Sequence, residues 1–242
     1  MSLSIEDTAG DPTPRAAVEL SVNGAALLAD ISGALIWPER RALLVADLHL
    51  EKGSAFAATG RFLPPYDTAA TLRLLAAVMD HYGIEAVYCL GDSFHDEAAG
   101  GRIAAPHAEA LAGLTRRCRW TWIIGNHDPA PPEGPWGGKV AEEAVLGPLV
   151  LRHQAEAARA APAGEISGHF HPKAAVCVRD KRLSRRCFAG DGRRLILPAF
   201  GAYTGGLNVL DPAIACHFPR GFTVQMIGGR DLYAFPSSVL LP

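Results

Sequence analysis

The first part of the chain alternates short apolar runs with polar stretches rich in glycine and proline. Two apolar runs, 17–22 and 25–38, are separated by the pair Asn23-Gly24, which is typical of a two-residue hairpin turn. A continuous apolar run follows within residues 41–50, and such a run is typical of a strand buried on both faces. The pattern therefore predicts a hairpin followed by a central strand.

The next segment has the periodicity of a helix. Leucines recur at helical spacing between Asp67, a candidate N-cap, and Gly83, a candidate C-terminal stop. The stretch before this helix, residues 51–68, is interrupted by glycine and proline. That composition predicts a loop.

The alternation of strand and helix continues to residue 128, and short strands dominate after it. We expect a strand at 85–92, a helix at 106–118 and a strand at 120–128. The later strands are expected at 148–153, 164–171, 174–179, 193–199 and, as a closing hairpin, 221–235. These elements predict an α/β (α+β) fold, a central two-layer β-sandwich flanked by helices. We expect one domain over residues 16–242, after a disordered lead at 1–15.

Composition narrows the classes of protein. The 242 residues are 49% hydrophobic with a formal net charge of −2, so binding of nucleic acid must use a local basic patch. The five cysteines never form a CxxC pair, which favours reduced thiols over a disulfide framework. No apolar run has the length of a membrane span, and the acidic N-terminus does not resemble a signal peptide. We therefore expect a cytoplasmic protein without membrane contact.

Side chains that bind metals follow the apolar runs in an ordered series. The series comprises Asp47 and His49, then Asp92, then Asn126, His127 and Asp128, then His153, and finally His169 and His171. Residues two apart on a strand point to the same face, so each closely spaced pair is expected to converge on one point. Glycine stands before three of these residues and suits close backbone approach. Each motif alone is typical of a turn or cap, but the complete series indicates a metal site.

This series, from Asp47 to His171, resembles the calcineurin-like metallophosphoesterases. The segments "DLHLEKG", "PPYDT", "GDSFHD" and "LPAFGAYTGGLN" look like the bacterial ligase-associated DNA damage response endonuclease branch of that superfamily. The resemblance implies a dinuclear metal-dependent phosphodiesterase, a nuclease in DNA repair, that uses in-line attack by a hydroxide bridging the two ions. It also implies DNA or RNA as the substrate and DNA ligase or nuclease repair partners.

The resemblance also assigns the ligands. Asp47, His49 and His171 would hold one ion, Asn126, His153 and His169 the other, and Asp92 would bridge them. Nitrogen and oxygen ligands without thiolate suit Mn²⁺, Fe²⁺ or Zn²⁺, and the resemblance favours Mn²⁺. Two divalent ions outweigh the two carboxylates and a hydroxide, so the centre should attract a phosphate ester.

Other residues are expected to act on the substrate. The resemblance places His127 beside the leaving group, as general acid or transition-state stabiliser, with Asp128 orienting its imidazole. His95 follows the second motif closely enough to contact substrate, and Lys52 and Arg61 lie where a cation could hold a phosphate. A solvated or capping loop position is the alternative for each of these three.

Two further segments have open interpretations. Residues 179–194 hold seven Lys or Arg against two Asp, which is typical of a solvated hairpin and also suits contact with a nucleic-acid backbone. The glycines of segment 197–208 permit close backbone approach, so we expect it to wall the substrate cleft.

The same motifs leave other functions open. Hydrolysis of a small nucleotide, a phosphomonoester or a lipid-linked pyrophosphate would use an identical metal centre. A non-catalytic scaffold of the same fold is disfavoured because the ligand series and His127 are complete. The oligomeric state is not indicated.

Overall fold

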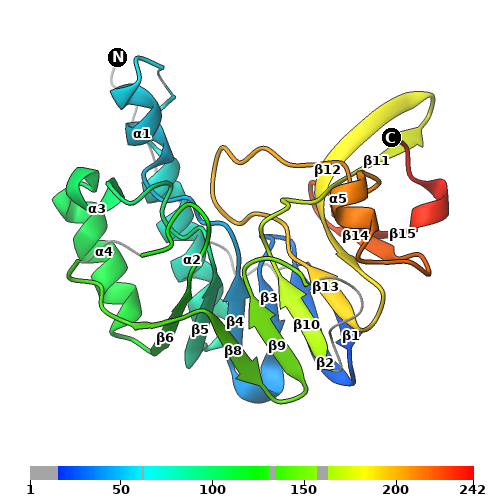
Figure 1. Cartoon of the computed structure of the whole chain (residues 1–242), viewed down its shortest axis with the longest axis horizontal. Helices are drawn as coiled ribbons and strands as arrows, with labels where there is room; N and C mark the ends of the chain where they lie inside the picture. Colours follow the sequence, from blue (N-terminus) through cyan, green and yellow to red (C-terminus); the bar gives the residue numbers. More distant parts are fainter. Residues whose placement is uncertain (1–15, 62, 131–133, 157–162) are drawn as a thin grey trace, which may run out of the picture.

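A computed structural model describes residues 16–61, 63–130, 134–156 and 163–242. The expected disordered lead at 1–15 lies outside the described residues. Two β-sheets form the centre of the molecule, and helices lie on either side of them (Figure 1). The predicted fold class, a two-layer β-sandwich flanked by helices, is thereby confirmed.

The first sheet has seven strands in chain order, antiparallel from β1 to β4 and parallel from β4 to β7. The strands are β1 Ala17–Val22, β2 Ala25–Asp30, β3 Leu35–Trp37, β4 Ala42–Val45, β5 Ala86–Leu90, β6 Arg119–Ile123 and β7 Lys139–Ala141. Asn23 and Gly24 both have positive φ, 48° and 83°, as a type I′ hairpin turn requires. The predicted hairpin is confirmed.

The second sheet has eight strands in the order β15-β14-β12-β13-β10-β9-β8, with β11 paired to β12. Its strands are β8 Glu143–Leu146, β9 Leu149–Arg152, β10 Gly164–Ser167, β11 Lys173–Val178, β12 Lys181–Gly190, β13 Arg194–Ile196, β14 Thr223–Ile227 and β15 Leu232–Pro236. Strand β10 is parallel to both β9 and β13, and the closing hairpin β14–β15 is antiparallel. The carboxyl ends of β9 and β10 therefore point the same way.

Strand β4 shows how the layers pack. Leu43 and Val45 face a core shared with the helices, whereas Ala42 and Leu44 face a core shared with the second sheet. All four side chains are at most 1% exposed. This two-sided burial explains why the strand is a continuous apolar run rather than an alternating one.

The helices lie mainly on the outer face of the first sheet (Figure 1). They are α1 Lys52–Ala58, α2 Asp67–Tyr82, α3 Ala99–Arg102 and α4 Ala105–Thr115, while α5 Pro212–Ala215 packs on the second sheet. The 3₁₀ turns are η1 Pro38–Arg40 and η2 Ser237–Val239. None of the described helices is long and apolar enough to cross a membrane.

Two local predictions around α1 and α2 are wrong. Helix α1 occupies part of the expected loop, and Asp67 is the first residue of α2 rather than its N-cap. The Asp67 carboxylate instead accepts the backbone N–H of Gly53 at 2.9 Å, seating α1 on the start of α2. A seven-residue helix is marginal in isolation, so this long-range contact is not visible in local sequence. Gly83 ends α2 with φ of 59°, as predicted.

Candidate metal centre

The residues of the ordered series lie close together at one end of the two sheets. Asp47 and His49 follow β4, Asp92 follows β5, and Asn126 and the two residues after it follow β6. His153 follows β9, and His169 and His171 follow β10. The carboxyl ends of these parallel strands meet there, which is where α/β sheets place their chemistry.

The closely spaced pairs converge by a different geometry from the predicted one. Strands β4 and β10 end before them, and five residues of the site have left-handed backbone: Asp47 (φ 55°), His49 (44°), Asp92 (46°), His169 (72°) and His171 (47°). The same-face strand argument is therefore wrong, because these residues lie in turns. Left-handed backbone costs a non-glycine residue roughly 1–2 kcal/mol, and such strain is concentrated at functional sites.

Glycines let the turns approach one another. A Cβ atom on Gly125 would lie 2.2 Å from the backbone nitrogen of Asp92. A Cβ on Gly91 would lie 2.3 Å from Nδ1 of His153, and one on Gly168 would lie 2.7 Å from Asp47. The prediction that these glycines serve close backbone approach is confirmed.

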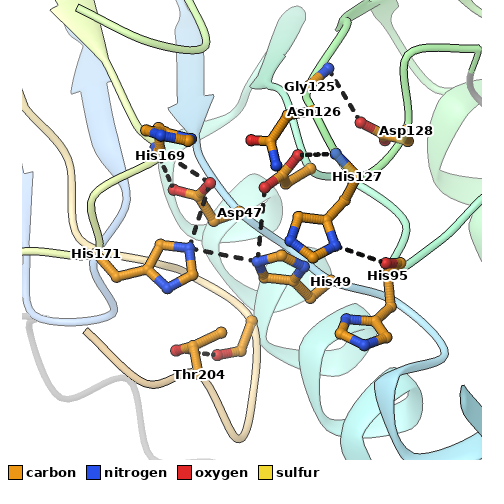
Figure 2. Close-up of polar contacts among 12 residues, drawn as sticks. Asp47, His49, His95, Gly125, Asn126, His127, Asp128, His169, His171 and Thr204 are labelled. Carbon is orange, nitrogen blue, oxygen red and sulfur yellow. Dashed lines mark hydrogen bonds and ion pairs between the residues drawn. The ribbon is translucent and has the colours of Figure 1, made fainter. Parts of the chain in front are cut away.

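The first cluster consists of Asp47, His49 and His171. Nε2 of His49 lies 3.3 Å from Nε2 of His171, which lies 3.4 Å from Oδ1 of Asp47 (Figure 2). Burial, with the neighbouring charges of His171 and His127, lowers the pKa of His49 to about 2. This imidazole is therefore neutral and available as a ligand across the physiological range.

The second cluster consists of Asp92, His153 and His169, with Asn126 beside it. Nε2 of His153 lies 3.0 Å from Nδ1 of His169, 3.0 Å from Oδ1 of Asn126 and 3.5 Å from Oδ1 of Asp92. Nδ1 of His153 lies 3.0 Å from the carbonyl oxygen of Leu90. If Nδ1 carries the proton and donates it there, the lone pair of Nε2 points into the cluster.

Asp92 faces both clusters. Its Oδ1 belongs to the second cluster, and its Oδ2 lies 3.9 Å from Nε2 of His49 in the first. One carboxylate with an oxygen toward each group has the arrangement that a bridging ligand needs.

A third cluster is formed by His49, His95 and His127. It shares His49 with the first cluster, and a neutral imidazole has a lone pair on only one nitrogen. His49 can therefore complete only one of these two clusters at a time. The first and second clusters share no residue, so they are compatible with each other.

The donor set fits a cation. Asp47 and Asp92 are 0% and 2% exposed, and their ion-pair partners are histidines. No lysine or arginine pairs with either carboxylate in the described part of the chain. Burying two carboxylates without a counter-charge costs several kcal/mol, so divalent ions suit these clusters.

Asp128 does not orient the His127 ring, contrary to expectation. The buried Asp128 carboxylate accepts the backbone N–H groups of Ser93, Phe94 and Gly125 at 2.8, 3.1 and 3.1 Å. Figure 2 shows the bond from Gly125. Burial raises its pKa to about 6, and these hydrogen bonds oppose that rise. Asp128 therefore ties the loops after β5 and β6 together.

The exposed His127 ring is positioned by His95. Nδ1 of His127 lies 2.9 Å from the carbonyl oxygen of His95, and the two rings stack with centroids 5.4 Å apart. Burial, followed by the charges of Lys52 and His127, lowers the pKa of His95. His95 thus lies at the site, as the sequence predicts.

The two predicted phosphate-holding cations differ in position. Lys52 is partly buried at the start of α1, and its charge acts on His49 and His95. Arg61 is exposed after α1 and makes no hydrogen bond or ion pair with a cluster residue among the described residues. The structure therefore brings Lys52 to the site and shows no polar contact between Arg61 and the clusters in the described ranges.

The glycine-rich segment 197–208 lies against the site, as predicted. Gly201 and Gly206 would place a Cβ 1.9 Å from the Leu48 carbonyl oxygen and 2.1 Å from that of His171. Motif reasoning did not single out Lys173 and Thr204, which lie beside His171. Neither residue type stands out there as a ligand, so no sequence signal marks them.

Comparison with known proteins agrees with this geometry. Residues 40–173 match the model of the calcineurin-like phosphoesterase family. No curated protein matches the chain significantly. The crystal structure of Pseudomonas putida nuclease MPE has 29% sequence identity and a TM-score of 0.70, covering 90% of this chain and 100% of that one.

An archaeal phosphodiesterase structure is more distant, with 11% identity and a TM-score of 0.35 over 81% of this chain and 98% of that one. The family match spans more than half of the chain and includes every member of the three clusters. This chain belongs to the calcineurin-like phosphoesterase family.

Proposed function

We propose that this protein is a dinuclear metal-dependent phosphodiesterase that cleaves nucleic acid. One observation carries the proposal: Asp47 and Asp92 are buried at the strand ends with histidines as their ion-pair partners. In a phosphoesterase, such a donor set suits cations that bind the phosphate of the substrate.

Each of the two compatible clusters would hold one ion. Asp47, His49 and His171 would bind the first, Asn126, His153 and His169 the second, and Asp92 would bridge both. When bound, two such ions activate a water molecule and neutralise charge on the phosphoryl oxygens during in-line displacement. The nitrogen and oxygen donors suit Mn²⁺, which the resemblance favours, and also Fe²⁺ or Zn²⁺.

His127 would protonate the leaving group or stabilise its charge. If its Nδ1–H donates to the His95 carbonyl, Nε2 is the ring atom left for the substrate. A proton on that nitrogen could pass to the leaving oxygen, and such transfer contributes about 10²–10⁴-fold to rate. His95 would then be a positioning residue for His127.

Support for a nucleic-acid substrate comes from the structural neighbour, a nuclease, and from the motifs of the endonuclease branch. A role in DNA repair beside ligase or nuclease partners, in the cytoplasm, is part of the same proposal and rests on that resemblance. Hydrolysis of a phosphomonoester or small nucleotide is the competing function.

A substrate panel tests the proposal. Protein stripped with a chelator and reloaded with Mn²⁺ should hydrolyse bis(p-nitrophenyl) phosphate and cleave DNA or RNA, and the stripped protein should do neither. Asp92→Asn is the matched inactive control. Strong turnover of p-nitrophenyl phosphate without cleavage of a diester or nucleic acid would reject the nuclease.

A further inference from the structure

A cavity of about 230 Å³ opens beside the first cluster. His171 contributes to its wall, together with Lys173, Arg185, Arg186 and Thr204. Thr204 lies below His171 and His49 in Figure 2. A ligand in this cavity would therefore be next to a phosphate held at the first cluster.

The cavity is strongly cationic. Lys173 on β11 and Arg186 on β12 are directly paired in the antiparallel register, so their side chains leave the same face of the hairpin. Like charges in such a pair destabilise a sheet unless an anion lies between them. Lys173, Arg185 and Arg186 form no ion pair with a carboxylate in the described ranges. Arg186 donates through Nη1 to the Ala199 carbonyl at 3.0 Å, which anchors it at the wall.

The opposite wall is tied to both ligand turns. The segment between β13 and α5 is anchored at two points. The N–H of Gly201 donates to the Asp47 carbonyl at 3.2 Å. Farther along, the Leu207 carbonyl accepts the N–H of Lys173 at 2.7 Å. Figure 1 shows this segment crossing between the helical side and the β11–β12 hairpin. The cavity is therefore fixed relative to the first cluster.

An exposed tyrosine adjoins Thr204 of this wall in the chain. Tyr203 precedes Thr204, has left-handed backbone with φ of 58°, and is 44% exposed. A cationic groove beside an exposed aromatic ring is the combination that binds single-stranded nucleic acid, through phosphate contacts and base stacking. Duplex bases are already stacked on each other and would not use the ring.

We propose that the cavity beside His171 binds the phosphate next to the scissile one in a single-stranded nucleic acid, with the adjoining base on Tyr203. This inference rests on the proposed function for the position of the scissile phosphate. Of the two interpretations of the basic run 179–194, it favours nucleic-acid contact, at Arg186. Lys173 and Arg186 would then be the residues that hold this phosphate.

Binding without catalysis tests the subsite independently of hydrolysis. A fluorescent single-stranded oligothymidylate is titrated in EDTA by anisotropy, at several salt concentrations, with wild type, Lys173→Gln, Arg186→Gln and Tyr203→Ala. Each lysine or arginine change should weaken binding several-fold at low salt and lower the salt slope by about 0.7. Tyr203→Ala should weaken binding about 5-fold or more and Tyr203→Phe should not, because the phenyl ring still stacks. Arg182→Gln is the matched control, because Arg182 is an exposed arginine of the same hairpin outside the cavity wall.

Neutral linkages test the position of the subsite. A methylphosphonate replacing the phosphate on one side of the scissile linkage should slow Mn²⁺-dependent cleavage by wild type several-fold, and should slow Lys173→Gln much less. Equal sensitivity of both proteins overturns the inference, as does unchanged oligonucleotide binding by both cation variants. The inference is also overturned if Lys173→Gln weakens the binding of duplex DNA more than the binding of single strands. Lys173-dependent binding without any cleavage would instead reject the proposed phosphodiesterase and leave the binding site standing.

Discussion

The backbone N–H of His127 donates a hydrogen bond to Oδ1 of Asp92, 2.9 Å away. The carboxylate that faces both metal-ligand clusters therefore also holds the turn that carries the exposed His127 ring. Asp128 adds two hydrogen bonds between the same two loops, from the N–H groups of Ser93 and Phe94. Ligand geometry and the position of His127 are coupled through these contacts.

Replacing Asp92 with Asn separates metal binding from folding. The amide oxygen can still accept the His127 N–H, but it brings no charge to the ions, so we expect Mn²⁺ binding to weaken and activity to fall by about 100-fold or more. The metal-free variant should be no less stable than metal-free wild type, because a buried carboxylate is removed. Asp80→Asn, on the exposed face of α2, is the control. Metal analysis and thermal unfolding in EDTA measure both effects, and normal Mn²⁺ binding would contradict the bridging role.

The loss of activity caused by His127→Ala should depend on the leaving group of the substrate. Cleavage of an oligonucleotide expels an alkoxide that needs a proton, so we expect a loss of about 10²-fold or more in kcat. Hydrolysis of bis(p-nitrophenyl) phosphate expels a stable phenolate, so the loss should be about 10-fold or less. Steady-state kinetics on both substrates give the comparison. An equal loss on the two substrates would show that His127 acts on something other than the leaving group.

Local patterns in the sequence predict much of this fold. The unbroken run in β4 reflects burial on both faces, and Asn23-Gly24 marks a turn because both residues have positive φ. Helix α1 is missed because its stability comes from Gly53 packing on Asp67, a contact between residues 14 apart. Such a contact leaves no periodicity to detect.

The site, like the fold, is predictable from the sequence only in part. Residue type and order predict a cluster of metal ligands, but the left-handed turns at Asp47 and His171 do not follow from side-chain chemistry. Asp128 was expected to act on its neighbour His127, whereas its partners Ser93 and Phe94 are 35 and 34 residues away. Sequence proximity is a poor guide to partners in a site assembled from several loops.

Replacing His171 and His169 should remove different ions under the proposed assignment. His171→Ala should lower affinity at the Asp47 cluster, and His169→Ala should lower it at the Asp92 cluster. Each variant should retain about one tightly bound Mn²⁺ where wild type retains about two, with the second ion weakened by about 10-fold or more. Equilibrium dialysis measures the stoichiometry. If either single variant lost both ions outright, the clusters would not be separate sites.

Gly125→Ala should damage the site through packing alone. Its Cβ would lie 2.2 Å from the Asp92 backbone nitrogen, so a loop must move. We expect the free energy of unfolding to fall by about 1–3 kcal/mol and most of the activity to be lost. Gly113→Ala in α4 is the matched control. Its Cβ would meet nothing within 4 Å, and helix propensity predicts a gain of about 0.5–1 kcal/mol. Urea denaturation of both variants tests the contrast. An unchanged Gly125→Ala protein would mean that the loops are not closely packed there.

The metal-free protein should lose stability as the pH falls below about 6.5. Burial lowers the pKa of His49 from 6.5 to about 2 in the folded protein, so below pH 6.5 the unfolded chain binds a proton that the folded chain does not bind. The free energy of unfolding is therefore unaffected by His49 above its unfolded pKa and decreases toward lower pH. At one pH unit below 6.5 the loss is about 1.4 kcal/mol. The depressed pKa of His169 acts in the same direction. Urea titrations in EDTA between about pH 7.5 and 5.5 should show this loss, and His49→Asn should lose less by roughly that amount. An identical pH dependence in the variant would mean that His49 takes up protons freely in the folded, metal-free state.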